Sequence, residues 1–553
     1  MKKKLLVFSL FALLSLTGCS GTKTTTSTSD VSGNTTAVEI PDDTITGDFI
    51  LQNESSVSIS PVDGVYTISA AGTYTASGKL SSGQILINAA EAEVELDLEG
   101  VSIANSSKSP IVIQDCADFD LKANKGTNNY IYDYRDTDYS QSDTEPRGAI
   151  YSENGDIKVK GTGTLSIISN KNSGIHGKDN VTVKNVTMLI KAMNNGIRGN
   201  DKVTIEENPT LGIVAGNNGI VTHNYDQGSS GAQHGNIYIT GGTTTINSYG
   251  DGIDAAWGCY ISQGTDTEGN TYTPVIDIYT NIYSSYTLNS SSSIKYAPPG
   301  GGGPGGGGGF DDGGWGGGSS AEKADESAKA IKANDTIDIS AGNIFSYTYD
   351  DGLHTNTDNI TGLTTNGHIN INGGTLNLKA SDDAIHADGT LTINDGTINV
   401  AESHEAIEGN QIVMNGGKAI VSGTNDGVNA STAITINGGY LDVTVPNSDD
   451  VDGIDSNGTY TQKGGIVIAR GPNNTNMAAL DTDGTCSISG GTLIVLGSLG
   501  AKGLTKGSGI SSYSLSLHSQ GSHTIKIDGE SLTFNNAYSY GKTQVYSSVS
   551  VSK

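Results

Sequence analysis

Short runs in which apolar and polar residues alternate occupy most of the chain. In one such run Ile369 and Ile371 are separated by a polar residue, and after two glycines Leu376 and Leu378 repeat the pattern. A period of two places alternate side chains on opposite faces of a strand, so each run predicts a short strand with one buried face. Few windows show the period of an amphipathic helix. The pattern therefore predicts an all-β protein.

The strand pattern repeats at an interval of about 22 residues. At this spacing Ile369 is followed by Leu391, Ile412 and Ile434, all apolar. Three short strands for each repeat, joined by Gly and Asn/Asp turns, describe one coil of a parallel β-helix, which is a solenoid. A single coil cannot bury its apolar side, so the coils stack on one core and need a cap at each end. A leucine-rich solenoid is excluded because no repeat contains a helical segment.

One apolar residue in the last strand of each coil, called the marker below, can be followed along the chain. The markers are Ile150, Ile175, Ile197, Ile220, Ile253, Ile331, Leu353, Ile385, Ile407, Val428, Ile454 and Leu480. The long intervals 253–331 and 353–385 indicate insertions, and 130–147 is predicted to be a third loop.

The first residues predict export. Three lysines precede an apolar run at 5–16, which is too short to span a bilayer as a mature helix. The run ends in Leu-Thr-Gly-Cys, with Cys19 where a lipobox is lipidated, although an ordinary secretory signal with a chance cysteine would look similar. We expect a protein held at the outer face of the cell membrane by a lipid on Cys19 and by no other membrane contact.

The expected organisation follows from these segments. Residues 1–18 are the lipoprotein signal peptide, and 19–37 are a flexible tether rich in Ser, Thr and Gly. The parallel β-helix spans 38–507 and carries a glycine-rich insertion at about 297–320. Residues 508–553 lose the repeat and are predicted to form a C-terminal β cap.

Charge and cysteine content narrow the function. The formal net charge is −28, which repels nucleic acid and anionic lipid headgroups and attracts divalent cations. Beyond Cys19 the cysteines are Cys116, Cys259 and Cys486. Three are too few for a disulfide framework, although one pair remains open. We expect a monomer without a nucleic-acid partner.

The turn just before each marker carries a pair of polar residues. Early coils have amides there, as in Asn194-Asn195, whereas later coils have acids, as in Asp350-Asp351 and Asp382-Asp383. Stacked strands lie about 4.8 Å apart. Carboxylates at that spacing repel by roughly 1 kcal/mol in water, so they need protons or cations. Clustered carboxylate oxygens suit Ca²⁺, which takes about 6–8 oxygen ligands.

We therefore predict a calcium-binding acidic ladder. Its ligands are expected to be Asp251, Asp254, Asp350, Asp351, Asp382, Asp383, Asp388, Glu405, Asp426, Asp452 and Asp455. A purely structural alternative remains open, because Asn and Asp are common at tight turns whose geometry they tolerate. The early amides are expected to be turn residues only.

Basic and aromatic residues near the ladder are candidates for contacts with a ligand. His354 and His386 follow their markers directly, and His is a poor Ca²⁺ ligand, so both are expected to orient neighbours or touch carbohydrate. Lys329 and Lys332 fall on the same strand edge and are placed in the same carbohydrate-binding set, although such lysines often only confer solubility. Loop tyrosines could stack on sugar rings or simply pack; they are Tyr130, Tyr132, Tyr134, Tyr139, Tyr272, Tyr279, Tyr283 and Tyr286.

Several motifs resemble those of the β-helical carbohydrate-binding domain family of bacterial surface proteins. They are Gly-Thr-Tyr-Thr at 72–75, Val-Glu-Leu-Asp-Leu-Glu-Gly-Val at 94–101, Ala-Lys-Ala-Ile-Lys-Ala at 328–333, Asp-Gly-Leu-His at 351–354 and Asp-Ala-Ile-His-Ala-Asp-Gly at 383–389. The resemblance covers nearly the whole mature chain. It implies a right-handed β-helix similar to pectate lyases, with bound calcium, that binds acidic plant polysaccharide such as polygalacturonate or pectin, and cellulose as a further ligand.

Two alternatives to non-catalytic binding remain open. A calcium-dependent pectate lyase would need a Lys or Arg base beside the metal, for which Lys329, Lys332 and Arg198 are candidates. A surface adhesin would only display loops such as the glycine-rich insertion. Ala384 in place of Gly and His404-Glu405 in place of Asp-Asp depart from the family pattern and leave the number of metal sites open.

Overall fold

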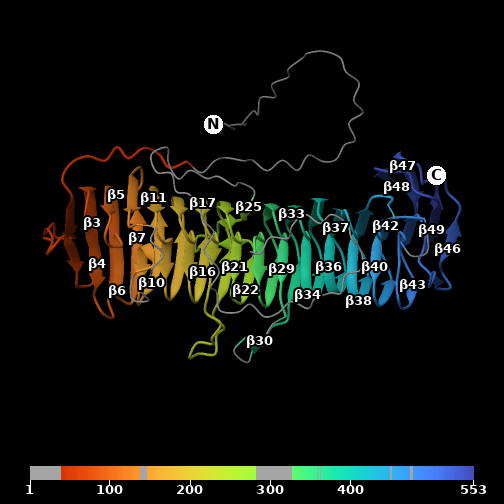
Figure 1. Cartoon of the computed structure of the whole chain (residues 1–553), viewed down its shortest axis with the longest axis horizontal. Helices are drawn as coiled ribbons and strands as arrows, with labels where there is room; N and C mark the ends of the chain where they lie inside the picture. Colours follow the sequence, from red (N-terminus) through yellow and green to blue (C-terminus); the bar gives the residue numbers. More distant parts are fainter. Residues whose placement is uncertain are drawn as a thin grey trace, which may run out of the picture. The chain divides into compact units, whose positions relative to one another are not determined.

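The computed structural model describes residues 39–136, 146–281, 327–357, 359–360, 363–448, 451–473 and 477–553. These residues contain no helix, and 43 strands join in one sheet whose pairings are mostly parallel (Figure 1). The predicted all-β, solenoid-like architecture is therefore confirmed. The predicted signal peptide and tether, with Cys19, and the glycine-rich insertion lie outside the described residues. Within the described part of the chain, no helix is long and apolar enough to cross a membrane.

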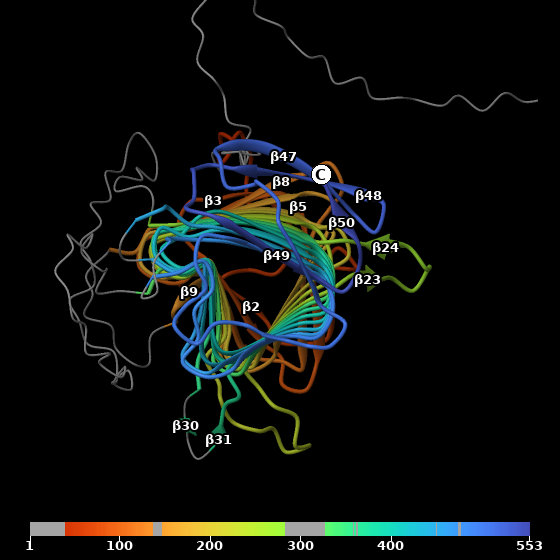
Figure 2. The same cartoon turned by 90° about the vertical axis from the view of Figure 1, so that its right-hand side faces the viewer.

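The strands form three ladders, one for each face of the stack, and successive coils superpose when viewed along it (Figure 2). The first face contains β3 (Gly72–Leu80), β5 (Glu93–Asn105), β7 (Asp118–Ala123), β10 (Asp156–Gly161), β13 (Asn180–Lys184), β16 (Lys202–Glu206), β19 (Asn236–Ile239), β22 (Gly258–Ile261), β27 (Thr336–Ile339), β32 (His368–Ile371), β34 (Ile385–Ile393), β36 (Ile407–Met414), β38 (Val428–Ile436), β41 (Thr459–Gln462), β43 (Cys486–Ile488) and β45 (Thr505–Lys506).

The second face follows the first along each coil. Beyond the later halves of β3 and β5, it contains β8 (Asn128–Asp133), β11 (Thr164–Ser169), β14 (Thr187–Ala192), β17 (Thr210–Ala215), β20 (Thr243–Ser248), β25 (Val275–Thr280), β28 (Asn343–Thr348), β33 (Thr375–Ala380), β35 (Thr397–Glu402), β37 (Lys418–Ser422), β39 (Tyr440–Thr444), β42 (Ile466–Arg470) and β44 (Thr492–Leu496).

The third face carries the markers. Its strands are β2 (Val65–Ile68), β4 (Gln84–Asn88), β6 (Ile111–Asp115), β9 (Gly148–Ser152), β12 (Ser173–Gly177), β15 (Ile197–Gly199), β18 (Ile220–Val221), β21 (Ile253–Ala255), β26 (Ile331–Ala333), β29 (Leu353–Thr355), the first halves of β34, β36 and β38, and β40 (Ile454–Ser456). The register joins the markers from Ile150 to Ile454 in one ladder, and all of them are buried, which confirms the predicted alignment.

The ends of the stack differ from its middle. At the N-terminal end β1 (Ile50–Asn53) pairs antiparallel with β3. At the C-terminal end β49 (Thr543–Ser547) pairs antiparallel with both β44 and β46 (Ser511–Tyr513). A separate small sheet contains β47 (Gly521–Ile527), β48 (Glu530–Asn536) and β50 (Val551–Ser552). Antiparallel pairing at the ends occupies backbone groups that another coil would otherwise use.

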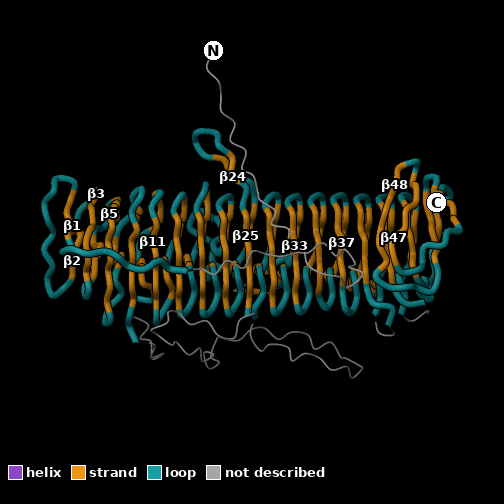
Figure 3. Tube along the Cα trace, turned by 90° about the horizontal axis from the view of Figure 1, so that it is seen from above, coloured by secondary structure: helices purple, strands orange, loops and turns teal. Residues whose placement is uncertain are grey.

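Loops leave the stack at several corners. The hairpin of β23 (Gly264–Thr265) and β24 (Thr271–Tyr272) projects from it (Figure 3), as does the hairpin of β30 (Asn359–Ile360) and β31 (Leu363–Thr364) (Figure 1). The predicted loop 130–147 starts later than expected, because strand β8 extends to Asp133. A run of tyrosines reads as a loop from sequence, but here its side chains pack.

The cysteines do not form a disulfide. Cys116, Cys259 and Cys486 are free and buried. Cys259 pairs in register with Ile237 and Ile337 on the first face, and Cys486 pairs with Tyr460. They therefore act as small apolar core residues, and the pair that the sequence left open is absent from the described residues.

A glycine stands directly before seven of the twelve markers, and packing between coils leaves no room there for a Cβ. A Cβ on Gly219 would lie 2.4 Å from the Cγ2 of Ile246, and one on Gly252 would lie 2.3 Å from that of Ile278. Ala330 occupies the position of Gly252 one coil further on. The residue that corresponds there to Ile278 is Ser346, which is smaller than isoleucine. The smaller partner makes room for the extra methyl group.

Gly219→Ala is therefore expected to destabilise the fold by about 1–3 kcal/mol, as overpacking of a filled core does. The same substitution should cost less in an Ile246→Ala background, because the clashing Cγ2 is gone. Chemical denaturation of the four proteins measures this coupling. Equal costs in both backgrounds would show that contact with Ile246 is not the reason for the glycine.

Candidate functional site

The turn between the second and third faces arranges the acidic ladder in a row along the stack. The residues two positions before the markers are called the turn row, and where such a residue is Asn or Asp, one of its side-chain oxygens accepts a hydrogen bond from the backbone N–H of the next coil. These bonds run from Asn218 to Asn195 (3.1 Å), Asp251 to Asn218 (2.9 Å), Lys329 to Asp251 (2.8 Å), Asp383 to Asp351 (3.1 Å), Glu405 to Asp383 (3.2 Å) and Asp452 to Asp426 (2.6 Å). Amides and carboxylates make the same bond.

The turn row therefore has a structural function, as the turn alternative predicted. It needs only one oxygen, and an amide supplies that oxygen as well as a carboxylate does. Asp251, Asp351 and Asp383 are at most 6% exposed, yet each brings a charge that the turn does not require. Burying such a charge is costly unless it is paired. The second oxygen of each carboxylate is thus the part available for another role.

The first acidic coils contain their own cations. Lys329 stands in the turn row itself, and its Nζ lies 2.5 Å from Asp350 Oδ2 and 3.1 Å from Asp351 Oδ2. Burial alone would lower the pKa of Lys329, but the charges of Asp351 and Asp350 outweigh burial and raise it. Lys332 Nζ lies 3.9 Å from Asp251 Oδ2. These lysines neutralise this part of the ladder internally.

The residue after each marker forms a second row, called the strand row, in which two histidines stack. The rings of His354 and His386 are 4.7 Å apart. His354 Nδ1 lies 2.7 Å from Asp351 Oδ2, and its Nε2 lies 2.7 Å from Asn356 Oδ1. Both ring nitrogens of His354 are therefore engaged by other side chains, and its two predicted roles stay predictions.

His386 is surrounded by carboxylates. Its Nδ1 lies 3.1 Å from Asp383 Oδ2 and 2.8 Å from Glu408 Oε2, and its Nε2 lies 3.3 Å from Asp388 Oδ1. Burial opposes protonation, but hydrogen bonds to these three groups raise the pKa of His386. It is therefore an imidazolium, which donates hydrogen bonds and cannot ligate a metal while protonated.

Beyond His386, three acids of the ladder lack a counter-ion of this kind in the part of the chain that the structure describes. In the described part of the chain, no Lys, Arg or His side chain forms an ion pair with Glu405, Asp452 or Asp455. Burial, together with neighbouring acids, raises the pKa of Glu405 to about 8, that of Asp452 to about 7 and that of Asp455 to about 6. Negative charge is in excess here.

We expect the metal-free protein to lose stability as pH rises from about 6.5 to about 8.5. Glu405 and Asp452 have a folded pKa above the unfolded value of about 4, so the folded state holds protons that the unfolded state has released. His386, with its raised pKa, contributes in the same direction above its unfolded value of about 6.5.

His176, whose pKa burial lowers to about 3, has the opposite effect only below about pH 6.5. Melting temperatures measured in EDTA across the upper window check the prediction, with a Glu405→Gln, Asp452→Asn variant as the control that should flatten the dependence. A melting temperature that rises with pH in this window would contradict it.

Only some predicted ligands come within the reach of one ion. Atoms of Asp350, Asp351 and Asp382 lie within 4.8 Å of one another and form an all-carboxylate group. Three further groups each include a histidine; they are Asp351, His354 and His386, then Asp382, Asp383 and His404, then Asp383, His386 and Glu408. In the described residues, the other predicted ligands stand outside these groups; they are Asp251, Asp254, Asp388, Glu405, Asp426, Asp452 and Asp455.

The donor set fits a hard cation only in part. Carboxylate oxygens suit Ca²⁺, but Lys329 already holds Asp350 and Asp351. The acids that lack a cation begin at Glu405. Glu408 was not among the predicted ligands, although its place directly after the marker Ile407 was the signal that would have added it.

The opposite end of the strand row is basic. Tyr151, His176 and Arg198 succeed one another in register on β9, β12 and β15. Arg198 donates from Nε to Asn200 Oδ1 (2.8 Å), and in the described part of the chain no carboxylate pairs with it. An unpaired guanidinium in a chain of net charge −28 is a place for an external anion.

Three of the eight tyrosines suggested as sugar platforms are buried. Tyr130, Tyr132 and Tyr279 are at most 7% exposed, and the first two pack with Ile168. Tyr272 donates its hydroxyl to Asp266 (2.7 Å). Tyr134 remains 45% exposed, and the other three, Tyr139, Tyr283 and Tyr286, lie outside the described residues. The packing alternative therefore holds for the buried three.

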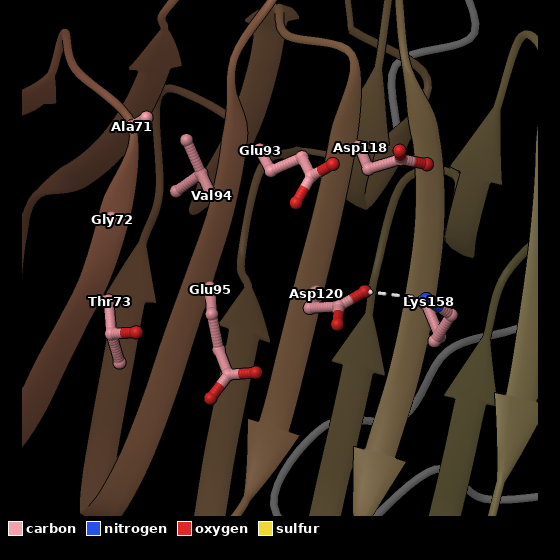
Figure 4. Close-up of a pocket in the computed structure, with 9 residues that line it drawn as sticks. All are labelled: Ala71, Gly72, Thr73, Glu93, Val94, Glu95, Asp118, Asp120 and Lys158. Atoms are coloured by element: carbon pink, nitrogen blue, oxygen red, sulfur yellow. Dashed lines mark hydrogen bonds and ion pairs between the residues drawn. The ribbon is translucent and has the colours of Figure 1, made fainter.

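A hollow of about 520 Å³ lies on the first face near the N-terminal end, over β3, β5, β7 and β10 (Figure 4). Glu93, Glu95, Asp118, Asp120 and Lys158 line it. Lys158 Nζ lies 3.1 Å from Asp120 Oδ1, and Lys160 Nζ lies 2.7 Å from Glu95 Oε2. Lysines thus neutralise part of this acidic surface, which is separate from the ladder.

Comparison with known proteins relates the chain to carbohydrate binding. A family described as carbohydrate-binding domain-containing protein matches residues 62–363 and 355–409. A protein of that description from Acetivibrio thermocellus is 32% identical over 194 residues, which cover 34% of this chain and 65% of the relative, just under two thirds of its length. A solved structure, described as the polysaccharide lyase-like protein from C. thermocellum in a gadolinium derivative, is 29% identical and covers 40% of this chain and 84% of its own, with a TM-score of 0.36. A TM-score of this size carries no weight for function.

Proposed function

Because the chain belongs to the family of carbohydrate-binding domain-containing proteins, we propose that it binds an acidic polysaccharide of the polygalacturonate or pectin type along the acidic ladder. Ca²⁺ held by ladder carboxylates bridges them to the uronate groups of the glycan. Cellulose is the alternative ligand. The protein acts as a monomer, anchored through a lipid on Cys19 to the outer face of the cell membrane.

The observation that carries the proposal is the row of buried carboxylates whose second oxygen the turn does not use. The amides Asn195 and Asn218 make the same backbone bond as Asp383, so the later acids are not explained by turn geometry. A chain of net charge −28 repels a polyanion unless cations lie between them. Glu405, Asp452 and Asp455 form no ion pair with a lysine, arginine or histidine in the described residues, and we propose that these acids share Ca²⁺ with the uronate oxygens of the glycan.

The basic residues of the strand row support an acidic ligand. A glycan laid along the third face meets Arg198 near one end and Lys332 further along the same row. A guanidinium binds a carboxylate through two parallel hydrogen bonds. In this arrangement, the polysaccharide contacts fixed cations at one end of the row and metal ions at the other. The proposed β-helix is right-handed, with coils of about 22 residues and a β cap at each end.

The lyase alternative finds less support in the lysines. A base must be neutral to take the proton beside the uronate carboxyl. The charges of Asp351 and Asp350 outweigh burial and raise the pKa of Lys329, and Asp254 is the main cause of the raised pKa of Lys332. Both lysines are therefore held in the protonated form. Absorbance of unsaturated products from polygalacturonate with Ca²⁺ tests this activity directly.

Calorimetric titration with polygalacturonate, with and without EDTA, tests the proposed function. We expect binding in millimolar Ca²⁺ and a loss of at least about tenfold in affinity, about 1.4 kcal/mol, after chelation. Cellulose fragments titrated in parallel separate the two ligand classes. Equal affinity for polygalacturonate in Ca²⁺ and in EDTA would overturn the calcium-bridging mechanism, and no binding under either condition would favour the adhesin alternative.

A further inference from the structure

A second concave surface lies on the first face, away from the acidic ladder. It has a volume of about 440 Å³ and is lined by strands β13, β16 and β19 and by residues 232–234. These three residues belong to the loop 222–235 between β18 and β19, which leaves the stack at this point (yellow in Figure 1). We call this surface the tyrosine groove because Tyr238 forms one wall of it.

The wall presents one free aromatic face. Tyr238 and Tyr260 occupy the same position in successive coils, and their rings stack 5.0 Å apart at an angle of 14°. On the other side of Tyr238, the neighbour in register is Thr204, followed by Thr182. Because threonine is much smaller than tyrosine, Thr204 leaves space beside the ring of Tyr238. The hollow is therefore bounded by the ring face that Tyr260 does not cover.

Polar groups surround this face in a preset arrangement. Asn224 Nδ2 donates to Asp201 Oδ1 (2.7 Å) and lies 3.0 Å from His234 Nδ1. Gln233 donates from Nε2 to the backbone oxygen of Tyr225 (2.6 Å), which fixes its amide. Lys202 Nζ forms no ion pair within the described residues. The groove thus offers acceptors and donors around a single aromatic platform.

This combination matches the chemistry of a sugar ring. A pyranose has a face of C–H groups, which packs on an aromatic ring, and a rim of hydroxyls, each of which both donates and accepts. Binding sites for small ligands commonly pair an apolar or aromatic surface with a few placed polar groups. A planar aromatic ligand would be served by large rings on both sides, whereas Tyr238 is the one Tyr, Phe or Trp among the residues that line the groove.

We propose that the tyrosine groove binds one pyranose unit of a glycan, stacked on Tyr238 and hydrogen-bonded through Asp201, Gln233 and His234. The site needs no metal and lies on a different face from the acidic ladder. The tyrosine groove is a second site beyond the function proposed above. Experiments can disprove binding at the groove or at the acidic ladder independently. A glycan that reaches both faces would be held at two points.

Binding of soluble oligosaccharides in EDTA tests the groove without the ladder. The probes are cellohexaose, which is neutral, and hexagalacturonate, which is acidic, each followed by ligand-observed NMR and by calorimetry. We expect the wild-type protein to bind at least one of them in EDTA and Tyr238→Ala to weaken that binding roughly tenfold or more. Tyr238→Phe keeps the ring and should stay close to wild type.

Matched variants separate binding from folding. Tyr260→Ala removes the stacked partner but not the wall of the groove, so it is the control for general packing. Gln233→Ala lies in the loop 222–235 and should weaken binding without lowering the melting temperature, which keeps the test valid if Tyr238→Ala unfolds. Failure of the wild type to bind either probe in EDTA overturns the proposal, and so does wild-type affinity in both Tyr238→Ala and Gln233→Ala.

Discussion

Replacement of Glu405, Asp452 and Asp455 by their amides should abolish calcium-dependent binding of polygalacturonate while the protein remains folded. Asp452→Asn keeps the side-chain oxygen that accepts from the backbone N–H of Ala478, and Glu405→Gln keeps the oxygen that accepts from Asn429 Nδ2, so both turns should survive. The variant loses three negative charges. If charge repulsion alone governed binding, it would bind a polyanion more tightly; if calcium bridges the two, it should bind at least about tenfold more weakly.

Charge repulsion and calcium bridging therefore predict opposite changes in the affinity of the variant for polygalacturonate. Calorimetry in millimolar Ca²⁺ at fixed ionic strength measures the sign, since exposed charges more than about 8 Å apart are largely screened at physiological salt. The matched control carries Glu54→Gln, Glu93→Gln and Asp118→Asn, which remove three charges near the N-terminal end of the stack. A ladder variant that folds, loses Ca²⁺ and still binds polygalacturonate like wild type would exclude bridging.

Calcium is expected to stabilise the coils that contain the unneutralised acids. An ion that binds only the folded state adds about 2.7 kcal/mol at roughly a hundredfold excess over its Kd. Solenoids unfold with nearest-neighbour coupling, so the effect should be largest close to the ion. EDTA should lower the melting temperature and increase amide hydrogen exchange in β36, β38 and β40.

Strands β14 and β17, which precede the turn-row amides Asn195 and Asn218, are the internal control and should keep their protection in EDTA. The variant with amides at Glu405, Asp452 and Asp455 should show no response to the chelator. A melting curve that is the same in EDTA and in millimolar Ca²⁺, with unchanged exchange in β36 to β40, would count decisively against calcium in the ladder.

Much of the fold could be predicted from the sequence, because in a solenoid residues that are one repeat apart lie next to each other. Ile369, Leu391, Ile412 and Ile434 fall in one ladder since each is displaced by one coil from the last. The same translation places the turn residues in a row, so the position of that row followed from the sequence, whereas which acids come together did not. The glycine before seven of the markers follows from the same stacking, because a Cβ there would clash with atoms of the next coil.

The spacing does not show which basic side chain neutralises which acid of the ladder. Lys329 lies 78 residues after Asp251 by number, across an insertion, yet its backbone N–H bonds to that residue and its Nζ binds the acids of the following coil. The three carboxylates around His386 come from its own coil and the next. Only the folded structure could divide the ladder into a neutralised and an unneutralised part.

The tyrosine groove likewise combines a feature that the sequence predicts with features that only the folded structure shows. The 22-residue spacing of Tyr238 and Tyr260 is visible in the sequence and predicts a stacked pair. The free face of Tyr238 depends on the small Thr204 beside it and on a loop that leaves the stack and returns over the gap. Local periodicity determines the coils, whereas the chemistry between them depends on charge, size and loop placement, which are properties of the assembled stack.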